Sequence, residues 1–146
     1  MSVEAPSAVT IRRFVAADEA GVIALWSEVF AGDPPHNEPR AMLARKVAFD
    51  DELIFVARAG ERVVGSVLGG YDGVRGWIYH LAVTPSERRR GIATRLMREV
   101  EQALIALGCI KINLQVRATN LGVVAFYQTL GYELAELASL GKRVKA

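Results

Sequence analysis

The spacing of apolar residues changes at Pro85, and this change restricts the folds open to the chain more than any other feature. Before Pro85, residues 53–58, 63–71 and 77–83 carry apolar residues in the short runs typical of strands, with turn residues between them. After Pro85 an apolar stripe recurs every three or four residues until Gly108, and it consists of Ile92, Leu96, Val100, Ala103, Leu104 and Leu107. The pattern predicts an antiparallel meander followed by one long helix that ends at Gly108.

Shorter segments extend this order toward the N-terminus. Residues 9–14 predict a strand, and the helix after it, with Asp18 as its N-cap, carries apolar residues on one face at Ala20, Ile23, Ala24 and Val29. Residues 32–37 interrupt the helix, and residues 38–49 resume a helical pattern. The excursion between the first two strands is therefore a helix-loop-helix.

Three more elements follow the long helix. Residues 110–116 alternate between apolar and polar as a half-buried strand, residues 120–130 predict a shorter helix closed by Gly131, and residues 132 to about 140 predict a last strand. A helix between two strands forms a right-handed crossover, so the strands 77–83 and 110–116 are expected to be parallel. The fold class is α/β (α+β), with a mixed central sheet flanked by helices.

Length and composition exclude several classes of protein. The 146 residues contain no repeat and suit one domain over 1–146, with 1–8 as a flexible N-terminus. No apolar run is long enough to span a membrane and no signal peptide is recognisable, so we expect a cytoplasmic protein. One cysteine, Cys109, and two distant histidines offer no metal cluster, and the single thiol is expected to lie in the core. Basic and acidic residues are nearly equal in number, with a net charge of +2, which argues against a nucleic-acid binder unless the basic clusters 88–90 and 142–145 form one patch.

The start of the long helix carries an unusual charge pattern. Arg88, Arg89 and Arg90 stand where the helix N-terminus already has a partial positive charge and unpaired N–H groups. A bound phosphate reverses the sign of this unfavourable interaction, and Gly91 and Ala93 would let the backbone approach it closely. A solvated basic loop explains the same residues without a ligand.

The motif Arg88-x-x-Gly91-x-Ala93, placed between strand and helix, resembles the coenzyme A signature of the GNAT acetyltransferase superfamily. The order of elements and the segments 81–85, 116–120 and 125–132 resemble the same family over almost the whole chain. Residues 69–76 and 139–143 look like the bacterial YpeA subgroup. The resemblance implies a GNAT fold in which the parallel fourth and fifth strands splay apart.

The resemblance also implies an N-acetyltransferase that moves an acetyl group from acetyl-CoA to a primary amine, on a small molecule or a peptide, by direct transfer in a ternary complex without a metal. The residues it assigns to the coenzyme are Leu81, Ala82, Val83, Arg88, Arg89, Arg90, Gly91, Ile92, Ala93, Thr94, Asn120 and Tyr127. Asn120 is equally well explained as an ordinary N-cap.

Direct acetyl transfer requires a general acid, an oxyanion donor and a base, and each can be matched to candidate residues. Tyr127 stands at the family's position for the general acid that protonates the leaving thiolate, although an aromatic packing residue would also fit there. The oxyanion would be held by a backbone N–H of the strand that contains Leu81 and Val83. For the base, residues 76–84 contain no carboxylate and Gln115 replaces one on the fifth strand, which leaves His80, a water relay or an amine that arrives neutral. Strand alternation, with Ile78, His80 and Ala82 on one face, favours a structural His80.

Acceptor specificity is expected in the helix-loop-helix excursion and in the turn at Asp72, with Trp26, Asp33, Asp72 and Gln115 as candidate contacts. Two other functions stay open: a non-catalytic acyl-CoA-binding sensor, favoured by the missing carboxylates, and a nucleic-acid patch. The expected partner is an amine-bearing acceptor rather than nucleic acid or a membrane, and the protein would be a monomer or a homodimer.

Overall fold

The computed structural model describes residues 8–145, which divide after Leu114 into two compact units. The predicted flexible N-terminus lies, for residues 1–7, outside the described residues. That all 146 residues form one domain stays a prediction.

The first unit is built on a five-stranded sheet with strand order β1-β2-β3-β4-β5. Neighbouring strands are antiparallel except β4 and β5, which are parallel, so the predicted mixed sheet and its crossover are confirmed. The strands are β1 (Val9–Arg13), β2 (Ile54–Ala59), β3 (Arg62–Tyr71), β4 (Gly76–Val83) and β5 (Ile112–Leu114).

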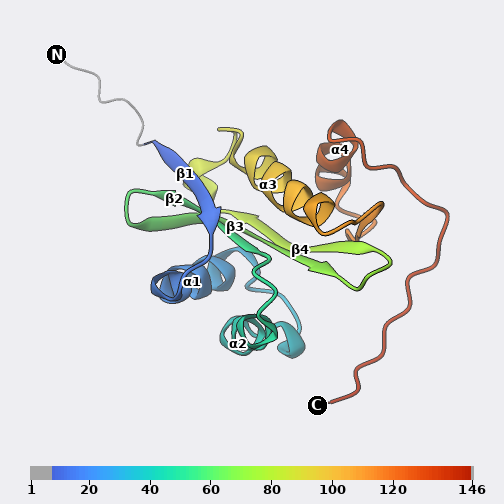
Figure 1. Cartoon of the computed structure of the whole chain (residues 1–146), viewed down its shortest axis with the longest axis horizontal. Helices are drawn as coiled ribbons and strands as arrows, with labels where there is room; N and C mark the ends of the chain where they lie inside the picture. The colour runs from blue at the N-terminus through green and yellow to red at the C-terminus, as the bar shows by residue number, and fades with distance from the viewer. Residues whose placement is uncertain (1–7, 146) are drawn as a thin grey trace. The chain divides into compact units, whose positions relative to one another are not determined.

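Helices cover both faces of this sheet. The helices α1 (Glu19–Val29) and α2 (Pro39–Phe49) lie on one face, and α3 (Ile92–Ala106) lies on the other (Figure 1). The loop between α1 and α2 contains a short 3₁₀ turn, and α2 begins where the Glu38 carboxylate accepts hydrogen bonds from the backbone N–H groups of Arg40 and Ala41. The predicted helix-loop-helix excursion is therefore confirmed.

The helix α3 packs close to the sheet because two glycines of β3 leave room for it. A side chain at Gly69 would place its Cβ 2.6 Å from Val100, and one at Gly65 would come within 3.0 Å of Leu96. The predicted stripe is buried except for Leu107, which is 54% exposed because the helix ends at Ala106.

A second apolar cluster fills the opposite face of the sheet. Trp26 of α1 and Leu43 of α2 are fully buried there against side chains of β2, β3 and β4. The Trp26 indole N–H donates to the Ser66 hydroxyl over 2.8 Å, so the one polar atom of this side chain is satisfied inside the core.

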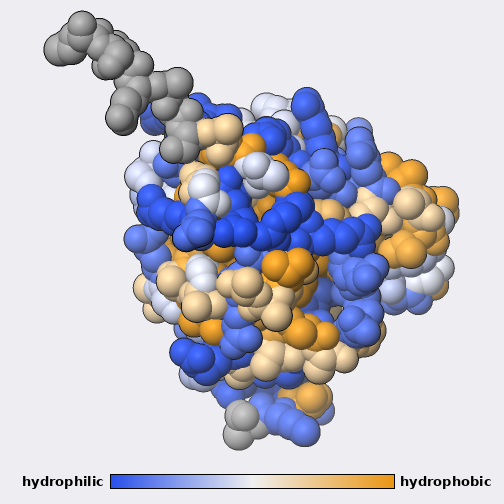
Figure 2. Space-filling model, turned by 60° about the vertical axis from the view of Figure 1, so that its left-hand side comes forward, coloured by the Kyte–Doolittle hydropathy of each residue, from blue (hydrophilic) through white to orange (hydrophobic). Residues whose placement is uncertain are grey.

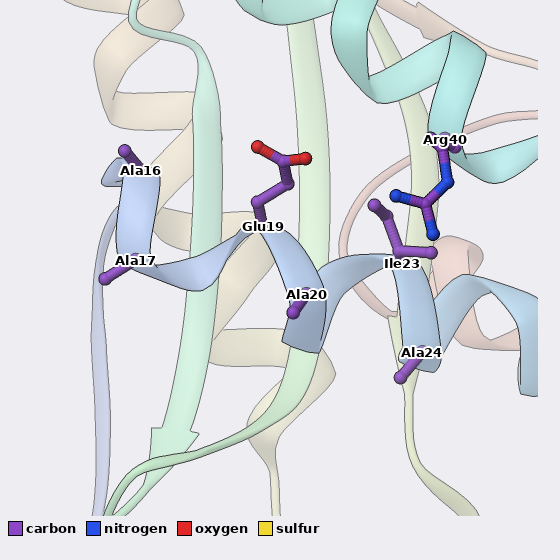
Figure 3. Close-up of a pocket in the computed structure, with 7 residues that line it drawn as sticks. All are labelled: Ala16, Ala17, Glu19, Ala20, Ile23, Ala24 and Arg40. Atoms are coloured by element: carbon purple, nitrogen blue, oxygen red, sulfur yellow. The ribbon is translucent and has the colours of Figure 1, made fainter.

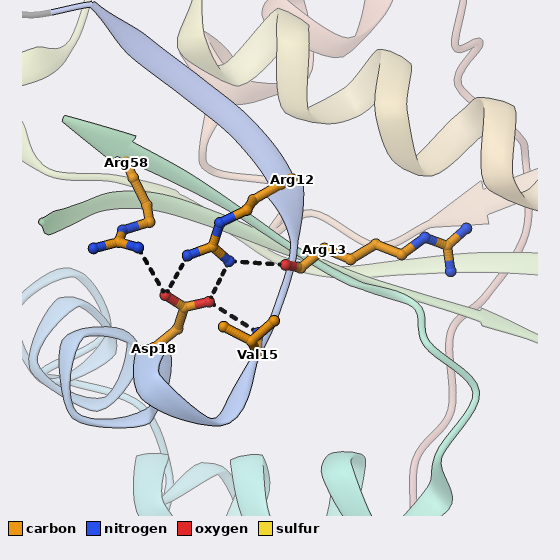
Figure 4. A network of polar contacts seen from close by, with 5 residues as sticks. All are labelled: Arg12, Arg13, Val15, Asp18 and Arg58. Atoms are coloured by element: carbon orange, nitrogen blue, oxygen red, sulfur yellow. Dashed lines mark hydrogen bonds and ion pairs between the residues drawn. The ribbon is translucent and has the colours of Figure 1, made fainter. Parts of the chain in front are cut away.

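Asp18 has a different role from the predicted helix N-cap. It stands at the N-cap position of α1, but its carboxylate makes no cap hydrogen bond to that helix. Instead it accepts two bonds from the Arg12 guanidinium, at 2.7 and 3.0 Å, and one from the Val15 N–H at 2.9 Å (Figure 4). Asp18, which is 2% exposed, therefore ties the end of β1 to the start of α1.

The second unit contains α4 (Leu121–Thr129), whose N-cap Asn120 accepts a hydrogen bond from the Val123 N–H at 3.4 Å. The predicted last strand is wrong, because residues 132–145 are not in a strand. Their exposed apolar residues Leu134, Leu137 and Leu140 recur every three residues, which does not match the two-residue period of a strand.

The predicted fifth strand is also shorter than expected. Only Ile112–Leu114 of β5 pair with β4, and Ile110 is 87% exposed. The alternation that predicted residues 110–116 therefore reached past both ends of the paired segment.

The surface mixes hydrophilic and apolar side chains. On the face that Figure 2 presents, apolar side chains gather in separate groups around a band of hydrophilic ones. No helix within the described residues is long and apolar enough to cross a bilayer.

Candidate functional site

The turn from β4 into α3 is braced by its own side chains. The backbone N–H of Thr84 donates to the Val64 carbonyl over 2.8 Å, and Arg88 Nε reaches back to the Val83 carbonyl over 3.1 Å. The Arg90 guanidinium pairs with the Glu87 carboxylate. Two of the three arginines are thus partly engaged in holding the loop, which the sequence did not predict.

The same turn leaves the start of α3 open to a ligand. Gly91 is the N-cap, has a φ of 75° and offers no side chain to cap the helix. Arg89, two residues earlier, also has a positive φ of 66°. Left-handed residues beside a helix start turn successive N–H groups toward one point, and the positive end of the helix dipole adds to their charge. A Cβ built at Gly91 would meet nothing within 4 Å, so the approach is open.

The strands β4 and β5 pair over only three residues each. Their register runs from Gly76 opposite Ile112 to Ile78 opposite Leu114, whereas β4 continues to Val83. Residues 79–83 therefore leave their pairing with β5 before the turn that leads to α3. A backbone edge of this kind can accept an extended ligand as an additional strand.

A β-bulge lies in the part of β4 that pairs with β3 but not with β5. Leu68 pairs with Tyr79 and Ser66 pairs with Ala82, so Val67 faces two residues, His80 and Leu81. The bulge breaks the predicted alternation. Ala82 joins the core on the α1 side, whereas Ile78 pairs with Gly69, which faces α3.

His80 takes an unusual conformation and environment at this bulge. Its φ is 51°, its side chain is 10% exposed, and its Nε2 atom is buried without a hydrogen-bond partner. The ring packs against Phe30 at 4.2 Å and Trp26 at 5.0 Å between centroids, and Nε2 lies 3.9 Å from the Asp33 carboxylate. Burial lowers the pKa of His80, and the charge of Asp33 partly opposes this shift. The imidazole is thus biased toward its neutral form.

The other predicted acceptor residues lie in varied places. Asp33, in the loop after α1, accepts a hydrogen bond from Asn37. Asp72 is exposed, and its carboxylate accepts from the N–H groups of Val74 and Arg75, which lowers the pKa of Asp72. Trp26 is fully buried, so it forms a wall behind His80 and offers no surface to solvent.

The remaining predicted residues belong to the second unit. Tyr127 on α4 is 9% exposed and packs edge-on against Phe126 and Tyr132. Burial raises the pKa of Tyr127 to about 12. Gln115 donates to the Ser139 hydroxyl within the same unit.

A groove of about 400 Å³ opens at the start of α1. Figure 3 shows small alanine side chains along it, with Glu19 on α1 and Arg40 reaching from α2 toward Ile23. It contains none of the residues predicted for catalysis or coenzyme binding.

Three residues with clear roles at β4 were not singled out from the sequence. Phe30 packs on the His80 ring, and Glu28 accepts a hydrogen bond from the Thr84 hydroxyl over 3.0 Å. Ser66 is buried beneath the bulge. A lone serine inside the apolar run 63–68 was the available signal, because a polar side chain in a buried strand needs a partner.

The fold and the turn define a class: an α/β protein whose parallel strands part beside an anion-attracting helix start. The family description "Acetyltransferase (GNAT) family" matches residues 22–132. The chain is 44% identical to an acetyltransferase of Pectobacterium atrosepticum over 134 residues, which cover 92% of this chain and 94% of the relative. The chain therefore belongs to the GNAT acetyltransferase family.

Solved structures agree on the fold. An aminoglycoside N-acetyltransferase in complex with CoA superposes with a TM-score of 0.78 at 19% identity and covers 99% of this chain and 100% of its own. The PaiA N-acetyltransferase of Thermoplasma acidophilum, also in complex with coenzyme A, gives 0.78 at 17% identity over 90% of this chain and 93% of its own. At these identities the likeness establishes the fold alone.

Proposed function

We propose that the protein transfers an acetyl group from acetyl-CoA to a primary amine, by direct attack of the amine on the thioester. Membership of the GNAT family supplies the reaction class. The N-acetyltransferase names of two structural neighbours, both with CoA bound, support this donor and nitrogen as the acceptor atom. Within the family, the segment 69–76 favours a place near the YpeA subgroup.

The observation that carries the proposal is the geometry at Gly91. An uncapped helix start, two positive φ angles and open space in front of Gly91 suit a doubly charged diphosphate. Since Arg88 and Arg90 are partly used to brace the loop, the backbone N–H groups from Arg89 to Thr94 would make most of the contacts.

The edge of β4 supports the placement of the rest of the donor. The pantetheine arm would add as a strand along Leu81, Ala82 and Val83, beyond the point where the pairing with β5 stops. The bulge at His80 and Leu81 disturbs the regular ladder, which favours a backbone N–H there as the donor to the oxyanion. No metal takes part in this proposal.

For the leaving thiolate we keep Tyr127 as the proton donor. A phenol whose pKa is raised to about 12 holds its proton throughout the physiological range, although it is a weaker acid than an exposed tyrosine. Asn120, which caps α4, is assigned to the coenzyme by resemblance only.

Titration calorimetry tests the donor site. Acetyl-CoA and coenzyme A should bind with similar affinity, whereas pantetheine, which lacks the diphosphate, should bind at least 100-fold more weakly. Equal affinities for pantetheine and coenzyme A would contradict diphosphate binding at the Gly91 turn. An absence of heat with all three ligands would contradict coenzyme binding by this protein.

Turnover then separates an enzyme from an acyl-CoA sensor. Release of the free thiol from acetyl-CoA is followed with putrescine, lysine amide, alanine amide and kanamycin as acceptors. Thiol release that depends on one of these amines supports the transferase, whereas tight binding without release across a wider panel favours the sensor.

A further inference from the structure

Three features of His80 distinguish it from an ordinary packing residue, and the first two are unfavourable for a residue that only packs. A positive φ of 51° is rare for a bulky side chain. A buried Nε2 without a partner gives up the hydrogen bond that water would supply. Burial also disfavours the charged imidazolium. Strained and unsatisfied groups gather at functional sites, because the surrounding fold maintains them against their cost.

The surroundings of the ring suit a proton acceptor. Phe30 and Trp26 form apolar walls that exclude water and strengthen nearby electrostatic interactions. The Asp33 carboxylate faces Nε2 from 3.9 Å, too far for a hydrogen bond with the neutral ring but close enough to stabilise a positive charge on it. The arrangement places a base and its counter-ion side by side.

We propose that His80 is the proton acceptor for the amine, that Asp33 is a positioning residue which stabilises the resulting imidazolium, and that the site accepts amines that arrive as cations. The inference rests on the proposed transferase function. His80 directly precedes Leu81, where that proposal puts the thioester, and it takes the place of the carboxylate that residues 76–84 lack.

The proton balance is closed. The ammonium gives one proton to the imidazole of His80, whose side chain is 10% exposed, and the free amine attacks the thioester carbon. The C–N bond forms and the C–S bond breaks. The thiolate takes its proton from Tyr127, and the second proton of the nitrogen restores the Tyr127 phenol. The imidazolium later releases the first proton to solvent. The products are an amide, coenzyme A with its thiol restored and one proton.

Two other titratable groups lie near His80: one already has a hydrogen-bond partner, and the other is the preceding residue of β4. Glu28 of α1 accepts the Thr84 hydroxyl, and Tyr79 precedes His80 on the strand and has a pKa raised by burial and by the charge of Asp72. Asp33 is 25% exposed, so an ammonium group can approach it from solvent.

A titration by NMR tests the pair without any acceptor. Removing the carboxylate charge in Asp33→Asn should lower the pKa of the His80 imidazole, whereas His36→Gln assigns the second histidine signal and should leave that of His80 unchanged. An unaltered His80 pKa in Asp33→Asn would overturn the pairing.

Kinetics test the catalytic role. With the amine that gives turnover, His80→Gln should lower kcat/KM about 100-fold or more at pH 7, and the deficit should shrink as the pH rises toward the amine's own pKa, where the base is no longer needed. His80→Asn serves as a second variant. Coenzyme affinity and thermal unfolding are measured for both variants to show that the fold is kept. His36→Gln, at an exposed loop position, serves as the matched control.

The outcomes separate the two proposals. A wild-type protein that binds acetyl-CoA but turns over no amine contradicts the transferase function. A wild-type enzyme whose rate and pH profile survive in His80→Gln contradicts only the role of His80.

Discussion

Trp26 and Ser66 form a hydrogen bond of 2.8 Å between an indole and a hydroxyl that are both fully buried, and it joins α1 to the middle of β3. The Ser66 hydroxyl in turn donates to the His80 carbonyl at 3.4 Å, at the bulge of β4. One small side chain thus links the first helix, the central strand and the strained residue at the candidate site.

Ser66→Ala is expected to destabilise the protein by about 1–3 kcal/mol, because the Trp26 N–H would stay buried without an acceptor. For a chain of this size, that corresponds to roughly 2–4 °C of Tm per kcal/mol. Thermal unfolding measures the shift. Ser27→Ala is the matched control, since its hydroxyl bonds to its own helix at an exposed position and its loss should change Tm by less than about 2 °C. Equal shifts in the two variants would contradict the buried bond.

The sequence predicts those parts of this fold that follow from periodicity. The stripe on α3 and the meander β2-β3-β4 are local patterns, and both are confirmed. The bulge at His80 is not encoded in apolar spacing, because it depends on the register in which β3 and β4 pair. The last predicted strand fails for a related reason: a strand needs a neighbour, and apolar residues alone do not provide one.

At the candidate site, the sequence identifies residues but not their relationships. The Gly91 turn was predicted from charge and glycine placement, and in the structure Gly91 has a positive φ of 75°. That Arg88 and Arg90 also brace the loop, or that Asp33 faces His80, depends on side-chain directions that only tertiary packing determines.

Asp18→Asn is expected to destabilise the protein by about 1–3 kcal/mol at neutral pH. The cost is limited because Arg12 is about one-third exposed, so water can solvate its guanidinium when the ion pair is lost. Burial opposes ionisation of Asp18, but the bonds from Arg12 and Val15 outweigh it, so its pKa in the folded state is lowered. The stabilisation is therefore full above the unfolded-state pKa of about 3.9 and is lost as the pH falls through the folded-state value.

Urea unfolding of wild type and Asp18→Asn between pH 2 and pH 7 checks this. The two free energies of unfolding should converge at the acid end. A difference that is independent of pH would contradict an ionised Asp18.

Tyr127→Phe is expected to lower kcat about 100-fold or more while the affinity for acetyl-CoA changes less than threefold, because a proton donor acts on the leaving thiolate and not on the bound donor. Since burial raises the pKa of Tyr127 to about 12, the wild-type enzyme should show no loss of activity from its ionisation below about pH 10. Stopped-time assays across pH 6–10 measure both effects. An unchanged kcat would assign Tyr127 to packing against Phe126 and Tyr132 alone.

Gly91→Ala separates backbone strain from coenzyme binding when it is compared with Gly60→Ala. Both glycines have positive φ angles, 75° and 62°, and neither has an atom within 4 Å of an added Cβ. Each substitution should therefore cost a similar amount, about 1–2 kcal/mol, in the free energy of unfolding.

Gly60, however, lies in the turn between β2 and β3, whereas Gly91 caps α3. Only Gly91→Ala should weaken coenzyme A binding, by about tenfold in calorimetry, since a methyl group there obstructs the approach of the diphosphate to the helix start. Equal affinities in the two variants would mean that the diphosphate binds elsewhere.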